Sequence, residues 1–233
     1  MFGNSDYMVY MVIGGVLSFI GMYVSNKLKS KFKKYSQVTI QSNLSGKEVA
    51  EKMLDYYGIH DVKVVAHKGM LTDHYNPLTK TIALSEPVYG ARTISAAAVA
   101  AHECGHAVQH DTAYSMLKLR SAIVPMVKIA SMGQQFLLIG AFMLLNSFPQ
   151  LMLIAIVAFL VTTIFSLVTL PVEFDASNRA LAWLEDSNVL QGKEQAGAKD
   201  ALHWAAMTYV SAALSSLVMV MYLIFKYMNA GRR

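Results

Sequence analysis

The sequence of 233 residues has few charged residues and almost no cysteine. Charged side chains make up 15% of the chain, whereas a typical soluble domain carries about a quarter. The single cysteine, Cys104, excludes an internal disulfide. The chain also lacks internal repeats and a low-complexity tail. These absences argue against an ordinary soluble domain and against a disulfide-stabilised scaffold.

The apolar surplus of the chain lies in four runs without a formal charge, and each approaches or exceeds the about 20 residues that span a bilayer core. The runs are Tyr7–Ser25, Ile129–Phe148, Leu151–Leu170 and Trp204–Phe225. So short a chain has too little polar surface to enclose four apolar helices, so we predict four transmembrane helices. No Lys or Arg precedes the first run, which favours an uncleaved anchor over a signal peptide.

The formal net charge of +5 is concentrated between the apolar runs. Segments 26–120 and 172–203 hold sixteen of the twenty Lys and Arg residues, and the SFPQ turn between the second and third runs holds none. The positive-inside rule therefore places both segments in the cytoplasm. This distribution accounts for the positive charge without a nucleic-acid partner, and we expect none.

The first cytoplasmic segment has the pattern of a small α+β unit. Ser45 and Glu48 form a capping box that predicts a helix ending near Gly58. Three strand patterns follow, in DVKVVAHKG, MLTDHYNP and KTIAL, and we expect a short antiparallel sheet. An alanine-rich helix is predicted from Ser95 to Asp111.

The predicted fold is a mainly α integral membrane protein with a cytoplasmic α+β catalytic unit. The predicted parts are the anchor (1–26), the cytoplasmic region with the sheet and the alanine-rich helix (27–120), the membrane hairpin (121–171), a second cytoplasmic helical region (172–203), and the last transmembrane helix with its tail (204–233).

The alanine-rich helix carries the HExxH motif His102-Glu103-Cys104-Gly105-His106. Residues four apart share one helix face, about 5–6 Å apart, which suits two imidazoles that bind one zinc ion. Glu103 projects about 100° round the helix and can act as the general base toward a zinc-bound water. Cys104 points away from the zinc face, and we interpret it as a packing residue.

Two histidines do not complete a catalytic zinc site, which usually has three protein ligands. His110 cannot be the third, because it lies about 12 Å beyond His102 along the helix axis. Glu173 directly follows the third apolar run on the predicted cytoplasmic side, and it is the favoured candidate. The weaker candidates are Asp175, Glu185 and His203.

Several segments together resemble the bacterial membrane zinc metallopeptidases of the YugP type, from about residue 44 to 214. These segments are GMLTDHYNPLTKTIALSEPVY, AVAAHECGHAVQH, LPVEFDASNRALAWLE and AAMTYVSAAL. The resemblance implies a gluzincin-like hydrolase of the bacterial cell membrane, with His102, His106 and Glu173 as Zn²⁺ ligands and Glu103 as the base. The architecture is also similar to HtpX and the CAAX prenyl proteases, where a membrane hairpin separates HExxH from the glutamate.

Those families typically read E-Y-x-A-D after the hairpin, and this chain has Ser177 in place of the final aspartate. Ser177 shares a helix face with Glu173, and Asp175 lies nearby. Either residue is a candidate to orient a zinc-binding imidazole.

The strand pattern LTDHYNP is a candidate edge for an extended substrate. His74 or Tyr75 could then stabilise the oxyanion of the tetrahedral intermediate, and Tyr209 in the fourth run is another candidate. The structural alternative is a hairpin whose turn Asp73 and Asn76 stabilise.

We therefore expect an integral-membrane zinc endopeptidase that cleaves membrane-associated or misfolded proteins at the cytoplasmic face. Its expected partners are a protein or peptide substrate and the lipid bilayer, and the sequence leaves open an oligomer or a regulatory membrane partner. The alternative is a membrane scaffold with a structural zinc site, although such sites normally have four protein ligands. A channel or transporter is disfavoured, because the apolar runs lack the charges that mark an ion path.

Overall fold

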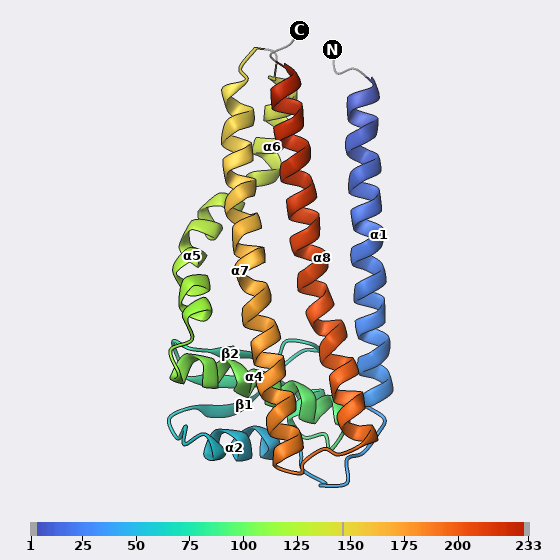
Figure 1. Cartoon of the computed structure of the whole chain (residues 1–233), viewed down its shortest axis with the longest axis vertical. Coiled ribbons are helices and arrows are strands. Elements are labelled where there is room, and N and C mark those ends of the chain that lie inside the picture. The colour runs from blue at the N-terminus through green and yellow to red at the C-terminus, as the bar shows by residue number, and fades with distance from the viewer. Residues whose placement is uncertain (1–3, 146, 231–233) are drawn as a thin grey trace. The chain divides into compact units, whose positions relative to one another are not determined.

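The computed structural model describes residues 4–145 and 147–230 (Figure 1). Residues 1–3 of the predicted anchor, Asn146 of the second apolar run and residues 231–233 of the predicted tail lie outside the described residues. The elements are, in order, α1 (Asn4–Tyr35), α2 (Gly46–Tyr56), β1 (Lys63–His67), β2 (His74–Asn76), β3 (Thr81–Ser85), α3 (Glu86–Tyr89), α4 (Ile94–Asp111), α5 (Ser115–Ser131), α6 (Gln134–Met143), α7 (Gln150–Asp186) and α8 (Lys193–Ala230).

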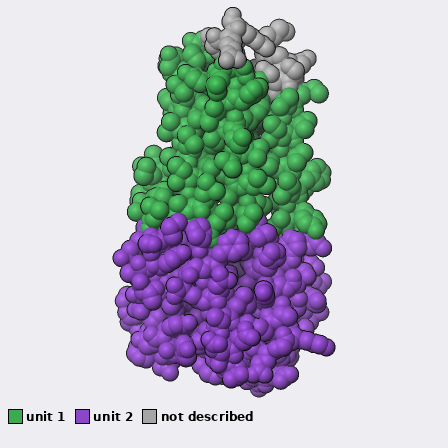
Figure 2. Space-filling view, viewed as in Figure 1, with its two compact units in different colours: residues 1–24, 119–170, 208–233 green, residues 25–118, 171–207 purple. Residues whose placement is uncertain are grey.

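The chain divides into two compact units, which Figure 2 distinguishes by colour. Unit 1 comprises residues 1–24, 119–170 and 208–233. Unit 2 comprises residues 25–118 and 171–207. The HExxH motif and Glu173 both belong to unit 2.

Unit 1 is built from apolar helical segments. Three helices of the described chain are long and apolar enough to cross a membrane, namely Met8–Tyr35, Gln150–Asp186 and Lys193–Asn229. Large side chains on these segments, such as Phe19 and Met221, are exposed, which a lipid environment would favour. The composition and helix lengths therefore fit a membrane protein.

The second apolar run is not one straight helix. Neither α5 nor α6 alone is long and apolar enough to cross a membrane, whereas the two together are. The helix axis bends by 50° at the break between them. Gly133 lies in this break with φ of 73°, a conformation that glycine adopts without strain. The described chain thus has three candidate spans, or four if the bent pair crosses as one.

The sheet of unit 2 is mixed, so the expectation of an antiparallel sheet is wrong for one of its pairs. The strand order is β1-β3-β2. β2 pairs antiparallel with β3, with Tyr75 opposite Ile82, whereas β1 pairs parallel with β3, with Val65 opposite Ala83. The difference arises because β3 inserts between the two preceding strands instead of adding beyond β2, a choice that no local pattern encodes.

Helix α4 runs through the core of unit 2. It begins after Thr93, whose hydroxyl accepts a hydrogen bond from the Ala96 N–H, and its alanines are buried. Trp183 of α7 and Met53 of α2 lie in the same core with almost no exposed surface. The predicted capping box at Ser45 is present and starts α2. Small side chains on α4 thus allow neighbouring helices to pack closely around the motif.

Candidate metal centre

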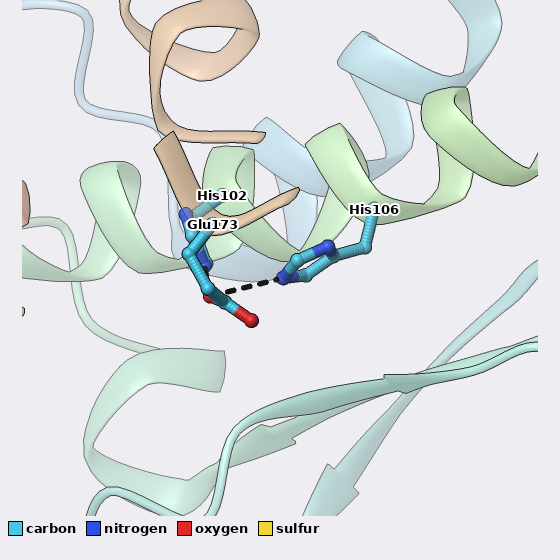
Figure 3. Close-up of side chains that lie close together, drawn as sticks. All are labelled: His102, His106 and Glu173. Carbon is cyan, nitrogen blue, oxygen red and sulfur yellow. Dashed lines mark ion pairs between the residues drawn. The ribbon is translucent and has the colours of Figure 1, made fainter. Parts of the chain in front are cut away.

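His102 and His106 lie one turn apart on α4, as their spacing predicts. Glu173 comes from α7, and its Oε2 lies 3.4 Å from His102 Nε2 and 3.5 Å from His106 Nε2. Figure 3 shows these side chains pointing toward one another from the two helices. Among the described residues they form a group that could hold a metal ion, with their ligand atoms within 4.8 Å of one another.

The spacing of these atoms fits a zinc ion better than direct ion pairs. A charge-assisted N–H···O hydrogen bond is about 2.7–2.9 Å long, and both distances to Glu173 Oε2 exceed this range. Two ligand atoms that each lie about 2.0–2.1 Å from a tetrahedral zinc ion are separated by about 3.3–3.4 Å. Two imidazole nitrogens and one carboxylate oxygen are also a usual ligand set of catalytic zinc. The residues therefore fit Zn²⁺.

The acidic groups around this centre are buried. The exposed fraction of Glu173 is 2% and that of Glu103 is 7%. Burial lowers the pKa of the His106 imidazole, but the adjacent Glu173 and Glu103 carboxylates raise it, and the net shift is upward. Buried carboxylates need a compensating positive charge. A divalent cation would supply that charge.

The outer nitrogen of each imidazole has a polar partner. His102 Nδ1 lies 3.1 Å from Ser177 Oγ, and His106 Nδ1 lies 3.0 Å from Gln109 Oε1. Asp175 accepts a hydrogen bond from Gln109 Nε2. Ser177 and Asp175, the two candidates from the sequence, thus serve different imidazoles, one directly and one through a glutamine.

Gln109 is the site residue that the sequence interpretation missed. Its position three residues after His106 on the same helix was the available signal, because residues three apart are neighbours on a helix surface. A glutamine at this spacing is common on exposed faces, so the pattern by itself did not distinguish it.

Gly105 permits the close approach of α7 to the motif helix. A Cβ atom at this position would lie 2.5 Å from the carbonyl oxygen of Ala176. A glycine within a helix costs about 1 kcal/mol relative to alanine. At this site that cost is offset by backbone contact between α4 and the turn of α7 that carries Glu173.

Other candidates from the sequence have different surroundings. His74 is exposed, with its Nδ1 2.8 Å from the carbonyl oxygen of Thr72. Glu185 and His203 are also exposed. Tyr209 belongs to unit 1, whereas the metal group belongs to unit 2.

Asp73 and Asn76, the two residues of the structural alternative, both accept hydrogen bonds. Asp73 accepts hydrogen bonds from the backbone N–H and the hydroxyl of Ser85. Asn76 Oδ1 accepts from the N–H of Leu78 at 3.0 Å. The Tyr75 hydroxyl lies 2.9 Å from His110 Nδ1 on α4. These contacts hold β2 at the edge of the sheet and tie it to the motif helix.

Cys104 is fully buried, and its thiol donates to the carbonyl oxygen of Ala50 on α2. Burial raises the pKa of this thiol well above its ordinary value, and the nearby Glu103 carboxylate adds to the shift. The thiol therefore stays protonated and packs between α4 and α2, as interpreted from the sequence.

Known proteins match this chain over most of its length. A family model described as "putative neutral zinc metallopeptidase" matches residues 8–228. A relative from Bacillus subtilis (strain 168), named "Putative membrane protease YugP", is 42% identical over 210 residues, which cover 90% of this chain and 92% of the relative. No solved structure matches the chain. The chain therefore belongs to the family of zinc metallopeptidases that this model describes, as its resemblance to the YugP type predicted.

Proposed function

We propose that the protein is a multi-pass membrane zinc endopeptidase of the gluzincin type. His102, His106 and Glu173 bind the zinc ion, and Glu103 is the general base. The observation that carries this proposal is the convergence of two imidazole nitrogens and one buried carboxylate at distances that suit tetrahedral zinc. Membership of a zinc metallopeptidase family and the name of the relative support the peptidase activity.

A bound zinc ion would lower the pKa of a coordinated water and polarise the scissile carbonyl group. The Glu103 carboxylate then accepts a proton from the attacking water and delivers it to the amide nitrogen that leaves. The contacts at both Nδ1 atoms leave each Nε2 directed at Glu173.

The proposed substrate site follows β2. This strand is an edge of the described sheet and packs against α4, so an extended peptide can add to it as a further strand. His74 on β2 is the proposed donor to the oxyanion. Normal turnover by a folded His74→Ala variant would show that His74 is not the donor to the oxyanion.

We place unit 2 at the cytoplasmic face of a bacterial cell membrane. Its lysines between Lys27 and Lys34 follow the first apolar run directly, as the positive-inside rule favours. The proposed substrates are accordingly membrane-associated or misfolded proteins with a segment accessible from the cytoplasm.

The decisive experiment compares wild-type protein in detergent with Glu103→Gln, using zinc content and chelator-sensitive cleavage of casein. We expect the variant to keep its zinc and to lose about 10²- to 10⁴-fold in cleavage rate, the usual contribution of a general base. Undiminished cleavage by Glu103→Gln would refute the mechanism. Zinc without any cleavage in the wild type would favour the alternative, a membrane scaffold with structural zinc.

A further inference from the structure

We propose that Gln109 is a positioning residue that aligns two of the three zinc ligands. Its side-chain oxygen sets the orientation and tautomer of His106, and its side-chain nitrogen holds α7 at the residue before Glu173. This inference rests on the proposed zinc site and specifies how that site is assembled.

Every polar group of the Gln109 amide has a partner. The residue is fully buried, at 0% exposure. Its Nε2 donates to the carbonyl oxygen of Val172 at 2.7 Å and to Asp175 Oδ2 at 2.8 Å. Its Oε1 lies 3.0 Å from His106 Nδ1. One side chain of α4 thus connects a motif histidine with two points on α7.

The two acceptors around Nε2 fix which way the amide faces. A rotation by 180° would place Oε1 against the Val172 carbonyl and the Asp175 carboxylate, and neither can donate a hydrogen bond. The same Asp175 oxygen also accepts a hydrogen bond from Arg179 Nε at 2.6 Å. The amide oxygen must therefore face His106.

The orientation of the amide determines the tautomer of His106. Because Oε1 can only accept, the hydrogen between the two residues belongs to Nδ1 of the imidazole. In the neutral ring Nε2 then has a free lone pair, and it lies 3.5 Å from Glu173 Oε2. A zinc ligand needs this lone pair, and outer partners of metal-bound histidines commonly provide it in this way.

The other imidazole has a different kind of partner. Ser177 Oγ, which faces His102 Nδ1 at 3.1 Å, can donate or accept, so its hydroxyl is compatible with either tautomer of His102. Gln109 therefore fixes the tautomer of His106, whereas the Ser177 hydroxyl does not fix the tautomer of His102.

The bond to Val172 extends the effect of Gln109 to the third ligand. Val172 directly precedes Glu173, and its carbonyl oxygen is held by Gln109 Nε2. Fixing this peptide group limits movement of the α7 backbone at the position from which Glu173 projects. A single buried amide therefore fixes the position of His106 on α4 relative to that of Glu173 on α7.

The test uses two matched glutamine variants of the full-length protein in detergent. Gln195 Nε2 also donates to a carbonyl oxygen of α7, that of Leu181, at 2.8 Å, but it lies outside the metal group. We expect Gln109→Met to weaken zinc binding by about 10- to 100-fold in a chelator competition assay, the usual effect of losing an outer partner. We expect Gln195→Met to bind zinc like the wild type. Equal affinity in Gln109→Met and the wild type would overturn the proposal, as would equal losses in both variants.

A second measurement reads the tautomer directly and needs no substitution of Gln109. In metal-free protein labelled with ¹⁵N-histidine, at a pH where the imidazoles are neutral, we expect the His106 ring to carry its proton on Nδ1. The spectrum of His106→Ala identifies the signal. A proton on Nε2 in the wild type would refute the tautomer assignment, whatever the stability of the Gln109 variants.

The outcomes separate this inference from the function on which it rests. If the wild type binds zinc stoichiometrically and Gln109→Met binds it equally well, the inference is wrong and the metal centre stands. If the wild type binds no zinc, the proposed function fails, and the positioning role fails with it.

Discussion

Units 1 and 2 place their apolar side chains in opposite ways. In unit 1, large side chains such as Phe19, Phe136 and Ile154 are exposed on the helices. In unit 2, large apolar side chains such as Trp183 and Met53 are buried in a core. The first pattern requires an apolar solvent such as lipid, and the second is that of a protein folded in water.

Buried polar groups differ between the units in a related way. In unit 1, the hydroxyls of Thr163 and Thr169 donate to carbonyl oxygens one turn back in their own helix. In unit 2, Gln109 and Ser177 bond between α4 and α7. A span in lipid must satisfy its polar groups within itself or against its neighbours. Unit 2 instead uses polar contacts between helices to assemble a site.

The strongest test of this contrast removes the acid that α7 brings to the centre. Because Glu173 is a proposed direct ligand, Glu173→Ala should lower the zinc affinity by more than the roughly 10- to 100-fold that is typical of losing a group that hydrogen-bonds to a ligand. Glu185→Ala, which removes an exposed acid from the same helix, is the matched control and should keep full zinc affinity. Zinc content by mass spectrometry would decide, and full zinc in Glu173→Ala would contradict the assigned ligand.

A charge on the apolar surface of unit 1 should have the next largest effect. Leu160 is exposed near the centre of the third apolar run, and an arginine near the centre of a span costs about 2.5–3.5 kcal/mol of insertion free energy. We expect Leu160→Arg to lower the membrane-integrated fraction of the protein, measured by carbonate extraction. Met70→Arg, at an exposed apolar position of unit 2, should leave that fraction unchanged. If both variants integrate equally well, the exposed apolar side chains of unit 1 do not face lipid, and the contrast with unit 2 is wrong.

Glycine replacements compare the packing of the two units. Gly105→Ala places a Cβ against Ala176, and such overpacking typically costs about 1–3 kcal/mol. It should lower both the thermal stability and the zinc affinity. Gly21→Ala in unit 1 has no heavy atom within 4 Å of the added Cβ, so it should be neutral or stabilise its helix by up to about 1 kcal/mol. Wild-type zinc affinity in Gly105→Ala would show that close approach at this point is dispensable.

The smallest effect concerns the buried thiol of unit 2. The reactive species toward a maleimide is the thiolate, and burial raises the pKa of Cys104, so its labelling should be slower than that of free cysteine at any given pH. Unfolding should restore the ordinary rate. A cysteine introduced at exposed Met70, in a Cys104→Ala background, should label rapidly without denaturant. Rapid labelling of native Cys104 would place it at the surface.

Much of the candidate site could be predicted because its parts are local or limited by topology. His102 and His106 share a face by helix geometry alone, and Ser45 begins α2 through its capping box. The sequence favours Glu173 as the third ligand, because it follows an apolar run on the membrane side where the charge distribution also places the HExxH motif. The structure brings its carboxylate to the two imidazoles.

Other features depend on packing between distant segments. The parallel pairing of β1 with β3 has no signature in either strand, and the φ of Gly133 that breaks the second run is one of several conformations open to glycine. Gln109 connects His106 with α7 only because α7 packs against α4, and the same packing selects the imidazole that Ser177 contacts.

The sequence by itself determined the apolar runs, the helix that carries HExxH and the spacing of its histidines, because these follow from the chain's own periodicity. Only the tertiary structure decided how the sheet is ordered, which outer partner serves which imidazole and how closely α7 approaches Gly105. The physical reason is that the energies of these contacts arise between helices and strands, where backbone approach and hydrogen-bond direction select one packing among several that the same local elements allow.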